Sequence, residues 1–122
     1  MKYLLILHMD PAAWDTLADA AREEFVQQHR AFHQTVAEAG ELIAAHTLAH
    51  VSRSTVVRVL DGAVSLRDGP LLTSPIQLSG FYLVDCETLK HAQELAALLP
   101  EVRMAGLGVE VRPIMQSSGI EM

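Results

Sequence analysis

The first strand of this chain is apolar on both of its faces, and this feature restricts the fold more than any other. The segment Lys2 to Met9 reads KYLLILHM, and its centre, Tyr3 to Leu7, contains no charged residue. A strand with one solvated face alternates apolar and polar residues, whereas a strand buried on both faces is apolar throughout. Lys2 to Met9 is therefore predicted to be a central strand of a sheet that is covered on both sides.

A long helix is predicted directly after this strand. Asp10 is a typical N-cap acid, Pro11 is a typical first helical residue, and Gly40 is a typical stop. The helix is expected to run to about residue 39, with a break near residues 19–22. Its apolar stripe, spaced by three and four residues, consists of Trp14, Ala18, Ala21, Phe25, Phe32, Val36 and Ala39.

The rest of the chain is predicted to add three core strands, a second helix and a hairpin. The strands are expected at residues 42–48, 78–85 and 109–115, and the helix at residues 87–99. The hairpin joins residues 55–60 to residues 63–67 through Asp61-Gly62, a pair that is typical of a two-residue type I′ turn.

Without the hairpin, the predicted order is strand, helix, strand, strand, helix, strand, in a single domain that covers residues 1–122. This is the order of an α+β fold, the ferredoxin-like βαββαβ plan with an inserted β-hairpin. Both helices then cover one face of the sheet. Because the other face is also predicted to be apolar, we expect a second copy of the chain to cover it in a two-fold homodimer.

The charge pattern argues against two classes of partner. Fifteen acidic residues against nine basic ones give a net charge of −6, and the basic residues form no block. Nucleic acids and anionic membranes both require clustered positive charge, so neither is expected as a partner. No apolar run approaches the ~20 residues of a membrane helix, and the run after Lys2 is too short for a signal sequence.

Cys86 is the one cysteine of the chain, so no internal disulfide can form and a reducing cytoplasm is expected. Asp85 and Glu87 flank it, and neighbouring acids raise the pKa of a thiol rather than activate it. A structural role is therefore favoured for Cys86.

Asp68-Gly69-Pro70 places a carboxylate, a conformationally permissive glycine and a conformationally fixed proline in a row. This combination predicts a rigid corner ahead of the strand at residues 78–85. We expect the corner to form one wall of a pocket and to hold the Asp68 carboxylate in a fixed place.

A series of short motifs runs in one order along nearly the whole chain. It comprises MKYLLIL with Asp10 and Trp14, then Phe32, Ala39 and Gly40, then Thr55-Val56-Val57-Arg58-Val59 with Asp61-Gly62, then Asp68-Gly69-Pro70, Gly80-Phe81-Tyr82, and Val109-Glu110-Val111-Arg112-Pro113. In this order the motifs resemble the DGPF branch of the YCII-related proteins. The resemblance implies a dimeric α+β barrel with a pocket between each sheet and its helices.

The resemblance also implies an active site made of a helix histidine and a carboxylate, and His29 and Asp10 occupy the matching positions. Members of the group include a dehydrochlorinase-like protein and proteins of polyketide tailoring. Three departures are notable: Leu71 replaces the family's phenylalanine, residues 72–75 replace a charged run, and His8 replaces a frequent tyrosine. These replacements predict an apolar or aromatic ligand.

His29 lies within the apolar stripe of the long helix, between Phe25 and Phe32, so its imidazole is expected to point inward. A buried imidazole needs a partner for each ring nitrogen. With Asp10 or Asp68 as one partner, His29 would be an oriented general acid or base. The alternative is a core histidine bonded to the backbone or a tyrosine, with Asp10 acting only as an N-cap and Asp68 only as a turn residue.

The histidines of the chain do not predict a metal site. His29 and His33 are spaced i, i+4, and His8 and His46 end neighbouring strands. Two helix ligands do not make a site, and no glutamate lies between them. These histidines are interpreted as pocket walls.

The leading hypothesis is a small cofactor-free enzyme of lyase, isomerase or cyclase type that acts on an aromatic or polyketide-like carbonyl compound. His29, Asp10 and Asp68 are the candidate catalytic residues. The candidate substrate-binding residues are His8, His46, Phe25, Phe32, His33, Phe81 and Tyr82. The alternative is a non-catalytic dimeric module that binds a ligand or regulates a partner.

Overall fold

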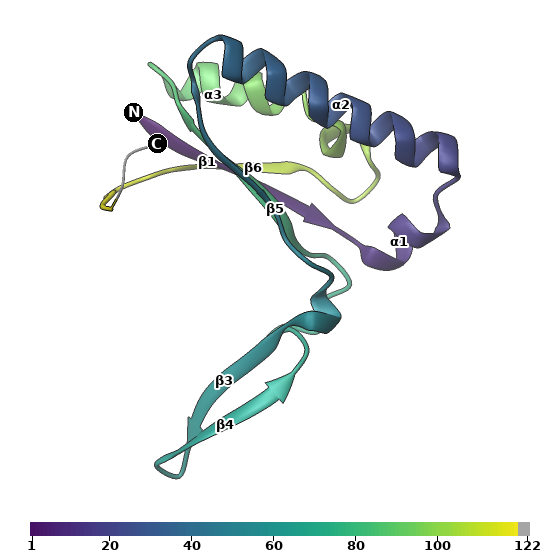
Figure 1. Ribbon diagram of the computed structural model, residues 1–122, viewed down its shortest axis with the longest axis vertical. Helices are drawn as coiled ribbons and strands as arrows, with labels where there is room; N and C mark the ends of the chain where they lie inside the picture. The colour runs from purple at the N-terminus through teal and green to yellow at the C-terminus, as the bar shows by residue number, and fades with distance from the viewer. Residues whose placement is uncertain (120–122) are drawn as a thin grey trace.

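The core of the molecule is a four-stranded antiparallel sheet (Figure 1). The computed structural model describes residues 1–119, so the last residues of the predicted domain, 120–122, lie outside the described part. The sheet consists of β1 (Lys2–Met9), β2 (Leu42–Thr47), β5 (Gln77–Asp85) and β6 (Val109–Pro113), in the order β2-β5-β1-β6. The prediction that the first strand is central is thus confirmed.

The helices lie on one face of this sheet (Figure 1). They are α1 (Pro11–Thr16), α2 (Asp19–Glu38) and α3 (Leu89–Ala96), with the short 3₁₀ helix η2 (Pro100–Arg103). A further 3₁₀ helix, η1 (Val51–Arg53), lies between β2 and the hairpin, away from this face. The predicted break in the first helix is present, at residues 17–18, slightly before the expected place. Gly40 ends the helical region with a φ of 73°, a left-handed conformation that favours glycine.

The architecture is α+β, as predicted, and its strand order is compatible with a ferredoxin-like fold. The second helix is shorter than predicted. The Thr88 side chain caps its start by accepting a hydrogen bond from the backbone N–H of His91 at 3.1 Å, and the helix ends at Ala96. Pro100 then begins η2, since a proline at a helix start lacks only an N–H that would have no helical partner there.

The two faces of β1 have different surroundings. Tyr3, Leu5, Leu7 and Met9 are buried under the helices, and Leu5 is fully inaccessible. Leu4, Ile6 and His8 alternate with them and are only half-buried, because no helix within residues 1–119 covers that face. The helix side therefore holds the core, which also contains Phe32, Val36, Tyr82, Val84, Cys86, Ala92, Leu95, Ala96 and Leu99.

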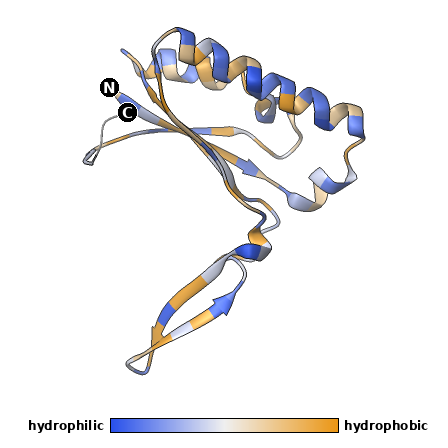
Figure 2. Ribbon diagram, viewed as in Figure 1, coloured by the Kyte–Doolittle hydropathy of each residue, from blue (hydrophilic) through white to orange (hydrophobic). Residues whose placement is uncertain are grey.

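The hairpin of β3 (Thr55–Leu60) and β4 (Ala63–Asp68), which we call the arm, extends away from the sheet and the helices (Figure 1). Its turn has a φ of 50° at Asp61 and 77° at Gly62, which confirms the predicted type I′ turn. Figure 2 shows apolar segments along both of its strands. One face of the arm carries Val57, Val59, Val64 and Leu66, each between 64% and 69% exposed.

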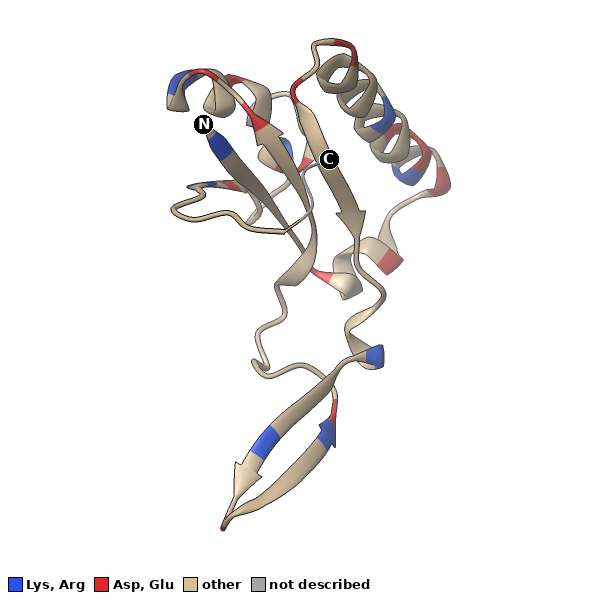
Figure 3. Ribbon diagram, turned by 60° about the vertical axis from the view of Figure 1, so that its left-hand side comes forward, with Lys and Arg blue, Asp and Glu red and all other residues tan. Residues whose placement is uncertain are grey.

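Basic residues are scattered over separate elements and do not gather into one patch (Figure 3). Among residues 1–119, no helix is both long enough and apolar enough to cross a membrane.

A close backbone contact at Gly80 joins β2 to β5. A Cβ atom at this position would lie 2.6 Å from the carbonyl oxygen of His46, which is closer than such contacts occur. Gly80→Ala should therefore push the two strands apart and lower the free energy of unfolding by about 1–3 kcal/mol, measured by chemical denaturation. Gly108→Ala is the matched control, because nothing lies within 4 Å of its Cβ position and its φ is outside the left-handed region. Equal stability of the two variants would contradict this account.

Candidate functional site

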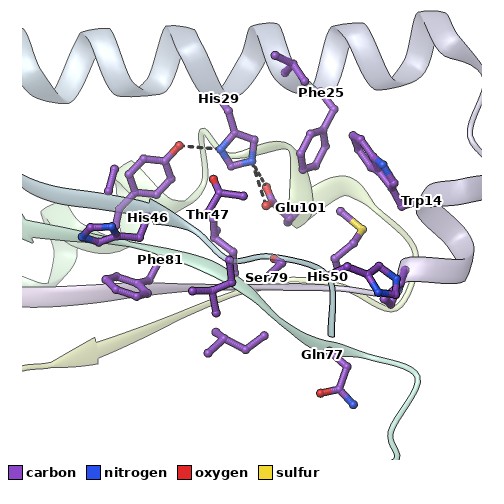
Figure 4. Close-up of a pocket in the computed structure, with 18 of the residues that line it drawn as sticks. Trp14, Phe25, His29, His46, Thr47, His50, Gln77, Ser79, Phe81 and Glu101 are labelled. Atoms are coloured by element: carbon purple, nitrogen blue, oxygen red, sulfur yellow. Dashed lines mark hydrogen bonds and ion pairs between the residues drawn. The ribbon is translucent and has the colours of Figure 1, made fainter. Parts of the chain in front are cut away.

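A cavity of about 750 Å³ lies between α2 and the sheet. Its walls come from α1, α2, β1, β2, β5 and the loops beside them, and Glu101 of η2 closes its inner side. About half of the lining side chains are apolar or aromatic, and polar side chains, four of them histidines, lie among them (Figure 4). A cavity of this size and composition is typical of a site for a small organic ligand.

Three polar side chains form a continuous hydrogen-bonded chain in the cavity wall (Figure 4). The Nδ1 atom of His29 is 2.7 Å from the Tyr82 hydroxyl. Its Nε2 atom is 2.9 Å and 3.0 Å from the two carboxylate oxygens of Glu101. Both ring nitrogens of the imidazole are thus occupied, which meets the expectation that a buried histidine needs two partners.

Each member of this chain is placed by a different element. His29 is on the sheet-facing side of α2, and its ring lies 4.7 Å from that of Phe25. Tyr82 is on β5 and points toward the helix, with Phe32 packed edge-on against it at 4.6 Å. Glu101 is the second residue of η2, directly after Pro100.

The hydrogen positions follow from the partners. A carboxylate bound through both oxygens can only accept, so Nε2 of His29 must carry the hydrogen. In the neutral imidazole, Nδ1 then accepts a hydrogen bond from the Tyr82 hydroxyl. When the imidazole is protonated, Nδ1–H donates to the Tyr82 oxygen instead. The network therefore accommodates a proton by reversing a single hydrogen bond.

Within this hydrogen-bonded network, the histidine side chain is more exposed to solvent than the carboxylate. The Glu101 side chain is 1% exposed, whereas the His29 side chain is 17% exposed. Burial raises the pKa of Tyr82 to about 12, and the negative charge of Glu101 adds to the rise. The Tyr82 phenol is consequently neutral at physiological pH and serves as a hydrogen-bond donor or acceptor.

The hypothesis that Asp10 or Asp68 orients His29 is wrong, since the carboxylate partner is Glu101. The Asp10 side chain caps α1, accepting hydrogen bonds from the N–H groups of Ala12 at 3.0 Å and Ala13 at 3.5 Å. Asp68 ends β4 in the arm and does not line the cavity. Asp10 thus has the N-cap role that is its alternative, and Asp68 has no place in the cavity.

The corner that contains Asp68 also differs from expectation. Gly69 and Pro70 line a second, smaller hollow of about 330 Å³ at the base of the arm and do not line the main cavity. The two hollows share Leu48, Val51, Gln77 and Leu78, so the corner stands behind the pocket wall rather than forming it.

The structure separates the predicted substrate-binding residues into three groups. Phe25 and His33 line the cavity from α2 and Tyr82 lines it from β5, with His46 and Phe81 at its border on the edge strand β2 and on β5. Phe32 is 2% exposed and supports Tyr82 from behind. His8 points to the opposite face of the sheet, together with Leu4 and Ile6, so its predicted contact with substrate inside this cavity is not observed.

Several cavity residues were not predicted from the sequence. Trp14 of α1 packs edge-on against Phe25 with ring centroids 5.0 Å apart and closes one end of the cavity. Glu101 gave one weak signal, since it is the only charged residue in the apolar run from residue 98 to residue 102. A charged group in such a run must either be exposed to solvent where the backbone bends or be paired with another group in the interior.

The histidines of the cavity do not make a metal centre by their geometry. Among residues 1–119, one group of three or more histidine, cysteine or acidic ligand atoms lies within 4.8 Å of one another, and it is elsewhere in the molecule. The cavity histidines are His29, His33, His46 and His50.

The chain is similar to known proteins along nearly its whole length. A family model described as the YCII-related domain matches residues 1–118. An uncharacterized protein of Rhizobium meliloti (strain 1021) is 27% identical over 114 residues, which cover 93% of this chain and 92% of the relative.

The raised pKa of Tyr82 should be directly measurable. Tyrosinate absorbance is measured immediately after a jump to each pH, for the wild type and for Tyr82→Phe. The difference between the two titrations reports Tyr82 alone and should have its midpoint near pH 12. Because the unfolded phenol ionises at about 10.0, the contribution of Tyr82 to the free energy of unfolding should be constant well below pH 10 and should fall by about 2 kcal/mol as the pH rises to 12. Glu101→Gln should lower the midpoint. A wild-type midpoint at 10.0 would contradict the buried network.

Proposed function

This chain belongs to the YCII-related family, and we propose that it is a small cofactor-free enzyme that moves a proton on an apolar or aromatic carbonyl compound. The observation that carries the proposal is the Tyr82–His29–Glu101 chain in the wall of a ligand-sized cavity. The Asp68-Gly69-Pro70 corner supports membership of the DGPF branch.

In the proposed mechanism, the Tyr82 oxygen is the atom that meets the substrate. It takes a proton from the carbon next to the substrate carbonyl while its own hydrogen passes to Nδ1 of His29. The imidazolium that results is paired with the Glu101 carboxylate, and the substrate becomes an enolate. Reversal of the two transfers returns the proton to carbon or to a leaving group, which completes an isomerisation or an elimination.

The high pKa of Tyr82 supports a concerted transfer. A phenol with a pKa of about 12 is a weak acid, so a free tyrosinate next to Glu101 would be costly. If Tyr82 passes its hydrogen to His29 at the same time as it takes the substrate proton, no tyrosinate forms, because the phenol remains neutral throughout. Glu101 acts as a positioning residue: it fixes the tautomer of His29 and stabilises the protonated ring.

The walls of the cavity support an apolar substrate. Trp14 and Phe25 form an aromatic pair at one end, and Leu7, Met9 and Leu78 contribute aliphatic surface. A flat, ring-containing or polyketide-like compound could pack against these groups while a carbonyl reaches the Tyr82 hydroxyl.

A non-catalytic role is the second candidate, and one observation favours it. Both ring nitrogens of His29 have partners without any substrate, so the network is complete as a purely structural element. In that case the cavity would bind its ligand without converting it.

We also propose that the molecule works as a two-fold homodimer in a dimeric α+β barrel, in a reducing compartment such as the cytoplasm. The sheet face turned away from the helices presents Leu4, Ile6 and Leu83, which no helix in the described part of the chain covers. The apolar face of the arm is equally uncovered. A second copy would bury both surfaces and would remove an apolar area that is unusual on a monomer.

The enzymatic proposal is tested by a thermal-shift screen of phenolic and polyketide-like carbonyl compounds, followed by product analysis of each hit. A ligand at 100 times its dissociation constant should stabilise the protein by about 2.7 kcal/mol. With a compound that is turned over, Tyr82→Phe and His29→Gln should each lower kcat at least ~100-fold, the usual effect of removing an acid or base. His91→Gln, outside the cavity, should keep wild-type turnover.

Two outcomes would reject this assignment. Hits that bind in the cavity but give no product with any compound would favour the ligand-binding module. Full turnover in His29→Gln would exclude the proton-transfer role of the network, whatever the reaction.

The homodimer is tested with two aspartates on opposite faces of one arm strand. Val59→Asp places a charge on the apolar face of the arm and should raise the dimer dissociation constant by at least about tenfold, or ~1.4 kcal/mol, in sedimentation measurements. Arg58→Asp, on the other face, should leave association close to wild type. A wild-type protein that sediments as a monomer at all concentrations tested would refute the dimer.

A further inference from the structure

We propose that Glu41, Cys86 and His91 form a binding site for a thiophilic divalent cation, with zinc as the best fit. The three residues meet at the end of the sheet opposite the cavity, near the N-terminus of β1. One ligand atom of each type, a carboxylate oxygen, a sulfur and an imidazole nitrogen, lies within 4.8 Å of the others. This site is independent of the proton-transfer function.

The spacing of the ligand atoms is close to that of a tetrahedral zinc site. With the usual zinc–ligand bond lengths, neighbouring ligand atoms in such a site are about 3.3–3.6 Å apart. Nε2 of His91 and Oε2 of Glu41 are 2.8 Å apart, and the longest separation within the group is at most 4.8 Å. Side-chain movements of about 1 Å would therefore bring all three atoms to one ion.

The backbone at all three positions is fixed by other interactions. The N–H of Glu41 donates to the carbonyl of Val36 at 3.0 Å, just before β2. The N–H of Cys86 donates to the carbonyl of Met1 at 2.9 Å, just after β5. His91 lies in the first turn of α3, where its N–H is held by the Thr88 cap. The ligands thus come from three segments that are held in place without a metal.

The chemistry of the ligands indicates which ion would bind. A thiolate selects zinc and similar soft cations over magnesium and calcium, which prefer oxygen ligands. Glu41 and a deprotonated Cys86 together balance the charge of a divalent ion. Three protein ligands leave a fourth position for water. The His91 side chain is 41% exposed, so an ion can reach the buried sulfur from solvent.

A second carboxylate is placed where zinc-binding histidines commonly have one. Oε2 of Glu94 is 3.8 Å from Nδ1 of His91, on the nitrogen that would not bind the ion. A carboxylate in this place orients the ring and increases its basicity as a ligand. In the protein without metal, the Glu41 carboxylate accepts hydrogen bonds from both the Cys86 thiol and His91, so the three proposed ligands already contact one another.

The test is cobalt binding to the full-length, metal-free chain, because thiolate coordination to Co²⁺ gives a charge-transfer band in the near ultraviolet. We expect one equivalent of Co²⁺, a thiolate band that Zn²⁺ abolishes by competition, and a rise of several degrees in the thermal midpoint with Zn²⁺. His91→Gln and Glu41→Gln should each weaken binding at least ~10-fold, the usual loss on altering a zinc-site group. Cys86→Ser should remove the band.

His33→Gln is the matched control, because it removes a cavity histidine and leaves the three ligands intact. It should bind Co²⁺ as the wild type does. Absence of the thiolate band in the wild type, or a band of unchanged affinity in His91→Gln, would overturn the proposal. His91 is exposed, so its variant decides the question even if Cys86→Ser fails to fold.

Discussion

A carboxylate that is 1% exposed must be compensated by its neighbours, and the position of Glu101 makes this requirement central to the molecule. Its two oxygens are held by His29, whose other nitrogen is held by Tyr82. The interaction therefore ties η2, α2 and β5 together across the helix–sheet interface. Removing one partner of such a buried pair typically destabilises a protein by about 3–5 kcal/mol, so the arrangement of the cavity wall and the stability of the core depend on the same contact.

The two faces of the sheet differ in how far they are buried. Its helix side encloses the core and the cavity, while Leu4, Ile6 and Leu83 on the other side are only half-buried. The opening strand is nevertheless apolar on both faces, as it would be in a sheet covered twice. Within residues 1–119 the helices cover one face of the sheet, and the other face and the apolar face of the arm are both left without a cover.

The features that were correctly predicted from the sequence depend on local signals. Asp61-Gly62 determines its turn through its own backbone preferences, and Gly40 ends a helix for the same reason. The pairing of His29 with Glu101 could not be predicted in this way, because the residues are 72 positions apart and meet only once η2 has packed under α2. The inward direction of His29 was predictable from helical spacing. Asp10 was misassigned because a local cap and a catalytic acid require the same residue type.

The limited access at Glu101 has a further consequence for the proposed chemistry. In the proposed mechanism, the proton taken from the substrate stays on the Tyr82 oxygen, while His29 receives the hydrogen that Tyr82 carried before. Beyond His29 the network ends at a carboxylate that has almost no contact with water, so little exchange with solvent occurs in that direction. The route to solvent is through the cavity, where the His29 side chain is 17% exposed. A hydrogen isotope removed from the substrate would therefore return to the same molecule to the extent that the bound ligand keeps water out of the cavity.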